Sequence, residues 1–470
     1  MAATSFAVGT AGLVTPSAQK MTLASSYLDI RNNGWTQQYL PELYEAEVEK
    51  YGDRSISGFI QMLGAEMPMA SDQVIWSEQG RLHLAYNGQI NPVTGVVDTI
   101  TGIDSGSTEA HAVRKGATLV AVVNSIVFKA FVKVGAENST SQLTIKPYGA
   151  ENVDDLSGIA TTDNQVIKFF VYGSEFKKGT ASMTESIEPN FLSLTNKPMI
   201  IKDHFEINGS DAGQIGWIEV SGEAGQNGYL WYLKSQGDTN KRFEDYLEMS
   251  VVEAEKSDST ADSDIPDGSE GLLSAIGNRG IVGTGFFDDS SDPVLASFDT
   301  LLTNLDEQGA IEENMLFLDR GANLGIDDML GAVNANFSGG TSFGVFNNSQ
   351  DMALNLGFSG FRRGSYDFYK TDWKYLNNKS TRGLVGGLEG VLVPAGTSSV
   401  YDQNLGQNVK RPFLHVRYRA SEADDRKLKT WITGSVGGAA TIGDDKMEVH
   451  YLSERCLVVQ AANNFVRFDS

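Results

Sequence analysis

The chain has 470 residues, which at about 150 residues per domain predicts about three structural units. Its 37 basic and 60 acidic residues give a net charge of −23, and a surface this acidic repels phosphate, which excludes sequence-specific recognition of DNA or RNA. The single cysteine, Cys456, excludes an internal disulfide and a CxxC zinc site and favours a reducing compartment. No apolar run approaches the ~18 residues of a membrane-spanning helix, and the N-terminus lacks the pattern of a secretory signal.

The first 65 residues divide into a polar part and a helical part. Residues 1–34 are small, polar and aperiodic, which predicts a flexible arm that is either disordered or ordered only against a partner. From Trp35 onward, apolar residues at helical spacing predict a helix that ends at Gly52, and a second short helix over Ile56–Leu63.

Residues 74–225 consist of short runs rich in β-branched residues, separated by Gly, Asn and Asp turns. This spacing predicts an antiparallel sheet or a small barrel rather than βαβ units. The predicted strands lie at 81–86, 118–134, 142–146, 166–172 and 217–220.

Helical periodicity returns after this β-rich part. An apolar stripe predicts a long helix over Tyr229–Lys256, which Gly237 bends or interrupts. A second helix begins at Asp292-Pro293 and ends at Gly309, and it is followed by a buried strand over Asn314–Leu318. A short helix is predicted at 326–330, and further strands at 413–418, 447–452 and 456–468.

Local signatures of catalysis and metal binding are missing from the sequence. There is no HExxH, no nucleophile elbow and no phosphate loop, and none of the five histidines has another at i+4. The acidic run Asp262-x-Asp264-x-x-Asp267-Gly268 places its third carboxylate one position late for a calcium loop, so it is interpreted as a solvated loop. We therefore expect no cofactor, no metal and no enzymatic activity.

Charge is unevenly distributed along the chain. Between Glu244 and Asp328 there are 21 acidic and 3 basic residues, a net charge of −18, whereas between Phe361 and Thr430 there are 13 basic and 7 acidic residues, a net of +6. Two interpretations stay open. The two regions attract each other between copies packed head to tail, or they neighbour each other within one chain.

The order of a polar arm, β-rich insertion, long helix, helix-and-strand domain and closing strands resembles the major capsid proteins of tailed bacteriophages with the HK-97 (Hong Kong 97) fold. Local stretches carry the resemblance. Tyr39–Val48 (YLPELYEAEV) and Gly64–Glu78 (GAEMPMASDQVIWSE) look like the segment that leads into the extended loop in capsid proteins of crAss-like gut phages. Glu454–Phe468 (ERCLVVQAANNFVRF) resembles the closing strands of many capsid proteins.

The resemblance implies an α+β fold whose regions have distinct roles. Residues 1–65 would be the N-terminal arm, 66–225 an extended loop enlarged by an inserted β domain, and 226–275 the spine helix and acidic loop of a peripheral domain. Residues 276–440 would form the axial domain, and 441–470 the return strands of the peripheral domain. The inserted β domain is a departure from a simple extended loop, which needs far fewer residues.

The function implied is a self-assembling head protein of a double-stranded DNA phage. Its partners would be copies of itself in hexameric and pentameric capsomers, together with a portal and auxiliary or cement proteins. DNA would be enclosed without specific binding, no membrane would be involved, and the virion would assemble in the bacterial cytoplasm. The alternatives are an encapsulin-like cargo shell and a β-rich surface or fibre protein that binds glycans.

Eight residues are candidates for contacts between subunits. Aromatic residues of the N-terminal part are favoured because an arm has little core of its own to join. Paired arginines and paired aspartates are favoured by the opposite charges of their regions. The candidates are Trp35, Tyr39, Tyr44, Trp76, Arg362, Arg363, Asp288 and Asp289.

Deletion of residues 1–34 is predicted to reduce the yield of assembled particles more than the yield of soluble protein. The reason is that an arm without a core contributes mainly through contacts with neighbouring subunits. Particle counts by electron microscopy, set beside the soluble yield, measure the effect. A truncated chain with the full-length particle yield would contradict the predicted role of the arm.

Overall fold

The computed structural model shows a mixed α+β protein in which strands predominate. It describes residues 66–80, 83–103, 111–136, 142–180, 187, 191–210, 219–221, 227–257, 264–287, 293–309, 311–336, 359–395, 397–402, 407–435 and 443–470. The predicted arm and the two helices expected within residues 35–63 lie outside these ranges. Contacts divide the chain into two compact units, Gln73–Asn196 and the remainder (Met1–Asp72 with Lys197–Ser470).

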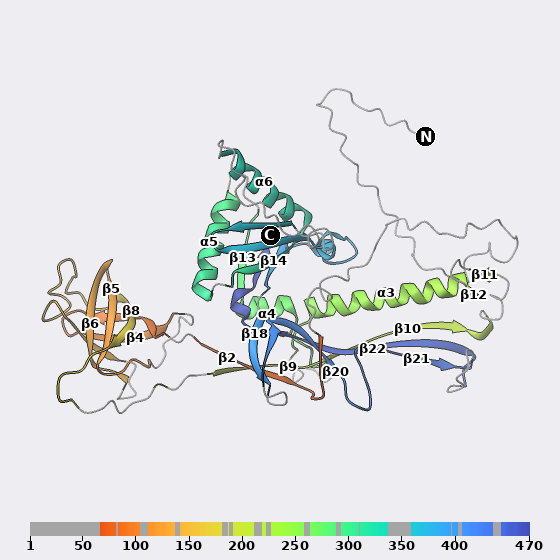
Figure 1. The fold of residues 1–470 in the computed structure, drawn as a ribbon, viewed down its shortest axis with the longest axis horizontal. Helices are drawn as coiled ribbons and strands as arrows, with labels where there is room; N and C mark the ends of the chain where they lie inside the picture. Colours follow the sequence, from red (N-terminus) through yellow and green to blue (C-terminus); the bar gives the residue numbers. More distant parts are fainter. Residues whose placement is uncertain are drawn as a thin grey trace, which may run out of the picture. The chain divides into compact units, whose positions relative to one another are not determined.

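The unit Gln73–Asn196 contains a closed barrel of six strands in the order β3-β4-β7-β6-β5-β8, drawn in orange and yellow in Figure 1. Its strands are β3 (Ala85–Asn91), β4 (Val96–Gly102), β5 (Ala117–Val123), β6 (Ile126–Val134), β7 (Leu143–Pro147) and β8 (Gln165–Ser174). Alternate residues of β5, namely Leu119, Ala121 and Val123, are fully buried in the barrel core. Of the two alternatives predicted from the sequence, an antiparallel sheet or a small barrel, the structure has the barrel.

Two turns close the barrel hairpins in ways that depend on local residue type. Asn124 and Ser125 both have positive φ, 48° and 69°, which is the geometry of a type I′ turn and divides the predicted run 118–134 into β5 and β6. Between β3 and β4, Gly95 has φ +69°, and a Cβ there would lie 2.3 Å from the carbonyl oxygen of Ile145. A glycine is therefore required at this turn.

The same unit contains a second, separate element, a two-stranded ribbon. Strands β2 (Val74–Gln79) and β9 (Phe191–Asn196) pair antiparallel, with Val74 opposite Asn196 and Gln79 opposite Phe191. The strands pair with each other and with no other described strand.

The remainder of the chain is built on two sheets. The first is five-stranded and has the order β1-β20-β22-β10, with β21 also paired to β22. Its strands are β1 (Glu66–Met69), β10 (Met199–Asn208), β20 (Leu414–Arg419), β21 (Lys429–Gly434) and β22 (Lys446–Val459). Helix α3 (Leu230–Glu253) lies along this sheet, where Phe243 and Leu247 pack on Val449 and Tyr451 of β22 (Figure 1).

Helix α3 corrects one expectation. Gly237 was expected to bend or interrupt the long helix, and α3 is not interrupted there, since it is one continuous helix over Leu230–Glu253. The cost of a glycine in a helix interior, about 1 kcal/mol, is small beside the burial of the Phe243 and Leu247 stripe.

The second sheet is six-stranded, with the order β13-β23-β17-β14-β16-β15. Its elements are β13 (Ile281–Thr284), β14 (Glu313–Leu318), β15 (Ser359–Arg363), β16 (Tyr366–Asp372), β17 (Gly390–Pro394) and β23 (Val466–Asp469). Helices α5 (Pro293–Gln308) and α6 (Arg320–Asn336) pack on one face, around Phe298 and Phe368. The expected short helix at 326–330 is thus the middle of a longer one.

A shared core joins the two sheets. Helix α4 (Leu272–Arg279), β17 of the second sheet and β20 and β22 of the first contribute to one buried cluster, which includes Val391, Val416 and Leu457. Strands β20 and β21, which lie within the segment 276–440 expected to form one axial domain, pair in the first sheet, and the domain bounds stay a prediction. The remaining elements are β11 (Glu219–Ser221), β12 (Asn227–Tyr229), α8 (Lys374–Asn377), α9 (Arg382–Val385), β18 (Thr397–Asp402), β19 (Gln407–Pro412) and η3 (Ala462–Asn464).

The core beneath α5 gives a stability prediction. The ring of Phe298 is fully buried and meets the ring of Phe368 edge-on, with 4.9 Å between centroids. Phe298→Ala is expected to lower the free energy of unfolding by about 3–5 kcal/mol, because it leaves a cavity as well as losing burial. Denaturant titration measures the change, with Leu324→Ala at an exposed position of α6 as the control. Equal midpoints for the two variants would contradict this packing.

Candidate interaction surfaces

The β2–β9 ribbon exposes apolar side chains. Ile75 is 64% exposed and Leu192 is 61% exposed, whereas Trp76 is buried and its indole donates a hydrogen bond to Glu78 at 3.1 Å. An isolated two-stranded ribbon is at best marginally stable in water. Burial of Ile75 and Leu192 against another surface would supply the apolar contacts that two strands alone lack.

The barrel has an outer face with both apolar and basic character. On neighbouring strands Val120 lies opposite Lys129 and Phe170, and Val122 lies opposite Val127 and Lys168. Val127 is 66% exposed, Phe170 is also exposed, and the ammonium of Lys129 lies 5.9 Å from the ring centroid of Tyr172. The three strands β5, β6 and β8 contain no carboxylate, so this face differs in charge from the strongly acidic chain as a whole.

The acidic and basic stretches of the sequence meet inside one chain. Arg363 makes two hydrogen bonds to Asp299, at 2.5 and 2.7 Å, Lys370 pairs with Asp327, and Arg382 pairs with Glu253 at 3.1 Å. In each pair the cation comes from the basic stretch and the carboxylate from the acidic one. The intramolecular interpretation is therefore confirmed for these residues.

Tyrosines reinforce this internal junction. Tyr366 donates a hydrogen bond to Asp306, and Tyr375 donates one to Glu253. Burial, together with the neighbouring carboxylate in each case, raises the pKa of both phenols, so both remain protonated donors at physiological pH.

The predicted contact residues fall into three groups. Trp35, Tyr39, Tyr44, Asp288 and Asp289 lie outside the described residues. Arg363 is engaged with Asp299, so its guanidinium is already satisfied within the chain. Arg362 and Trp76 differ in exposure. The side chain of Arg362 is half exposed, and its Nε lies 3.6 Å from a carboxylate oxygen of Asp367, whereas Trp76 is buried. The structure brings none of the described candidates together in one site.

A buried charged cluster fixes the point where β1 joins the first sheet. Arg455, of which 4% is exposed, donates hydrogen bonds to Ser453 at 2.9 Å and to the carbonyl of Lys427 at 3.0 Å, and lies 3.5 Å from Glu66. Burial lowers its pKa from the usual arginine value. The neighbouring Glu454, also buried, is 2.8 Å from Arg426. Each of these buried charges therefore lies beside a group of opposite charge.

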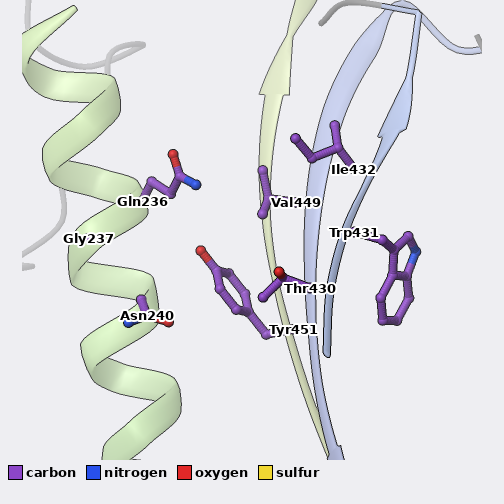
Figure 2. Close-up of a pocket in the computed structure, with 8 residues that line it drawn as sticks. All are labelled: Gln236, Gly237, Asn240, Thr430, Trp431, Ile432, Val449 and Tyr451. Carbon is purple, nitrogen blue, oxygen red and sulfur yellow. The ribbon is translucent and has the colours of Figure 1, made fainter. Parts of the chain in front are cut away.

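A groove of about 500 Å³ lies between the N-terminal half of α3 and strand β21 (Figure 2). Gln236, Gly237 and Asn240 line the helix side. On the sheet side the lining residues include Ile432 of β21 and Tyr451 of β22. Figure 2 shows Gln236 and Tyr451 directed toward each other across the groove, whereas the ring of Trp431 points away from α3, where it stacks on His450 with 5.0 Å between centroids. We call this feature the α3 groove.

An apolar tip projects from α9, between β16 and β17. Leu384 is 75% exposed and Val385 is 74% exposed, the highest values among the large hydrophobic residues that the structure describes. Gly386 and Gly387 follow with φ of +67° and +76°, which ends the helix. Neither this tip nor the α3 groove was identified from the sequence. The Leu-Val-Gly-Gly run was the one available signal, and it equally fits a strand end.

The described residues contain no group of three or more His, Cys, Asp or Glu side chains placed to hold a metal ion. In the calcium-like run, Asp267 pairs with Lys197, and Gly268 forms a β-bridge with Lys256, so this end of the run is engaged in local structure. Among the helices in the described ranges, none combines the length and apolar character needed to cross a membrane.

No protein-family model and no curated protein matches the chain. It is similar to a solved structure from Gordonia phage Cozz, with a TM-score of 0.39 and 10% identity, over 97% of this chain and 98% of that one. It is similar to one from Microbacterium phage Oxtober96, with a TM-score of 0.39 and 10% identity, over 94% and 99%. A capsid structure of the cyanophage P-SCSP1u gives a TM-score of 0.35 and 7% identity, over 76% and 84%.

The single thiol gives a prediction about reactivity. Cys456 is fully buried in β22, and burial raises its pKa to about 12. Because the thiolate is the reactive form, we expect no reaction of the native protein with Ellman's reagent at pH 8 on the scale of minutes, and one equivalent per chain after denaturation. Rapid stoichiometric reaction of the native protein would show that β22 opens.

Proposed function

We propose that this chain is the major capsid protein of a tailed double-stranded DNA bacteriophage with the HK-97 fold, a structural protein rather than an enzyme. It assembles with copies of itself into the hexamers and pentamers of an icosahedral head. The observation that carries the proposal is the β2–β9 ribbon, an element that exposes Ile75 and Leu192 and is not part of a larger described sheet.

The ribbon supports assembly for an energetic reason. Burial of one large aliphatic side chain is worth about 1.5–3 kcal/mol, and a two-stranded element cannot gain this within itself. A shell subunit gains it from its neighbours, because ribbons and arms add interface area beyond the subunit's own core. The strong exposure of Ile75 and Leu192 is therefore expected in a separate subunit and is relieved in a shell.

The proposal assigns each region of the HK-97 fold to elements of this chain. The ribbon and the barrel form the extended loop with its inserted domain. The five-stranded sheet with α3 as its spine forms the peripheral domain, and the six-stranded sheet with α5 and α6 forms the axial domain. Residues 1–65 form the arm that reaches over neighbouring subunits.

The charge of the chain suits a container. The internal ion pairs neutralise part of the acidic stretch, but the chain as a whole keeps a net charge of −23. A wall with this charge does not adhere to packaged DNA, which is enclosed without specific binding. A portal and auxiliary or cement proteins complete the head, which assembles in the bacterial cytoplasm.

Negative-stain electron microscopy of the purified full-length chain tests the proposal. Icosahedral particles or hexameric and pentameric capsomers are the expected result. A protein that stays monomeric at high concentration, in the presence and absence of crowding agents, would overturn it.

The ribbon gives a sharper prediction. Replacement of both apolar residues (Ile75→Ser with Leu192→Ser) is expected to raise the concentration needed for assembly at least tenfold, because a loss of about 1.4 kcal/mol per contact is a factor of ten. Light scattering over a concentration series measures this onset. The control is Val93→Ser, which makes the same kind of change at an exposed position in the β3–β4 turn. An unchanged onset in the double variant would separate the ribbon from assembly.

A further inference from the structure

We propose that the apolar tip of one copy, Leu384 and Val385, inserts into the α3 groove of a neighbouring copy. This inference rests on the proposed self-assembly and names one of its contacts. It follows from four features of the described residues: an unusually exposed tip, an open groove, the distance between them within one chain, and the charges beside each.

The tip is a supported projection rather than a loose loop. Arg382, at the start of α9, pairs with Glu253 at the end of α3, and the hydroxyl of Thr381 donates to the carbonyl of Tyr375 at 2.6 Å. The packing behind it is close, because a Cβ on Gly383 would lie 2.5 Å from the carbonyl oxygen of Leu376. Leu384 and Val385 are thus presented to solvent by a fixed base, which lowers the entropy cost of binding.

The groove leaves room for small side chains between polar and apolar lining residues. Gly237 lacks a side chain on the helix side, and a Cβ built there would meet nothing within 4 Å. Ile432, on the opposite wall, is 46% exposed. Strand β21 pairs with β22 and with no other described strand, so the groove is open along that edge. Gln236 and Tyr451 provide polar groups across the floor (Figure 2).

The tip and the groove of one chain cannot meet. Arg382 holds α9 at the Glu253 end of α3, whereas the groove lies beside Gly237. The 16 residues from Gly237 to Glu253 span about 24 Å of helix, at 1.5 Å per residue. A tip that occupies the groove must therefore come from another copy, and such a contact is heterologous, joining different surfaces of the two partners.

Charge favours the same pairing. Lys379, on the turn that leads to the tip, is exposed and makes no ion pair with any described residue. Glu244 is one turn beyond the groove on α3, where it accepts a hydrogen bond from the lining residue Asn240 at 3.1 Å, and it also makes no ion pair within the described ranges. Insertion of the tip would bring a lysine toward a carboxylate at the rim, where such pairs guide orientation.

A disulfide trap tests the contact directly. The double variant Val385→Cys with Gly237→Cys is assembled under reducing conditions, oxidised, and run on a non-reducing gel. Because about 24 Å of helix separates Gly237 from Glu253, where Arg382 holds α9, a bond between these two cysteines joins two copies, and buried Cys456 does not interfere. We expect a ladder of covalent oligomers. The matched control, Val385→Cys with Val93→Cys, should give none.

A mixture of the two single variants tests whether the contact is heterologous. Each copy then carries only one of the two reactive surfaces, so covalent dimers are expected and no longer products. Assembled particles of the double variant without crosslinks would overturn the inference and leave the proposed function standing. A wild-type chain that forms no assemblies would instead overturn the proposed function.

A blocking pair gives an independent measurement. Gly237→Leu fills the groove, whereas Gly237→Ala improves helix propensity and leaves most of the groove open. We expect the leucine variant to raise the assembly onset at least tenfold and the alanine variant to leave it within twofold. Lys379→Glu should slow assembly, and its combination with Glu244→Lys should restore the rate. Equal onsets for Leu and Ala at position 237 would contradict the inference.

Discussion

Strand β22 is the constraint on which the larger unit depends. It pairs along its length with β10 on one side and with β20 and β21 on the other, and from Tyr451 to Val459 every residue is buried. Its C-terminal half also enters the core that joins the two sheets, and seven residues later the chain adds β23 to the second sheet. The last 25 residues therefore tie together strands that lie up to about 390 positions away in sequence, as in the contact of Arg455 with Glu66. A fold with such distant pairings gains stability only when most of it is in place.

The bounds of β22 could not be predicted from the local sequence pattern. Two strands were expected, at 447–452 and 456–468, with Ser453-Glu454-Arg455 between them. The structure instead has one strand through these residues, since Arg426 pairs with Glu454, and Glu66 and Ser453 contact Arg455. A local pattern of apolar and polar residues does not reveal partners that lie so far away in sequence. Where burial follows a regular period, as in α3, α5 and the barrel strands, the elements were predictable.

The charge pattern illustrates a similar limit. Opposite charges on two regions of a sequence indicate that the regions attract each other. They do not indicate whether the attraction acts within one chain or between two. The pairs of Arg363, Lys370 and Arg382 with acidic partners answer the question for these cations by geometry. Most of these groups are partly exposed, so each pair contributes little to stability by itself, and their main effect is on orientation. The pair of Arg382 with Glu253 has that effect on α9, because it fixes the apolar tip at one end of α3.

The interaction surfaces could not be predicted from the sequence because they depend on which apolar residues the fold leaves outside. Ile75, Leu192, Leu384 and Val385 are ordinary core residue types, and in the sequence they look like core positions. Their exposure arises from topology: a ribbon of two strands has no second layer, and α9 ends at two glycines before the chain can turn inward. A net charge of −23 opposes association of such chains. Each apolar contact must therefore be small and geometrically specific, so that it does not cause nonspecific aggregation. Contacts of that kind are weak singly and become strong only when many close at once, which is the behaviour that a closed shell requires.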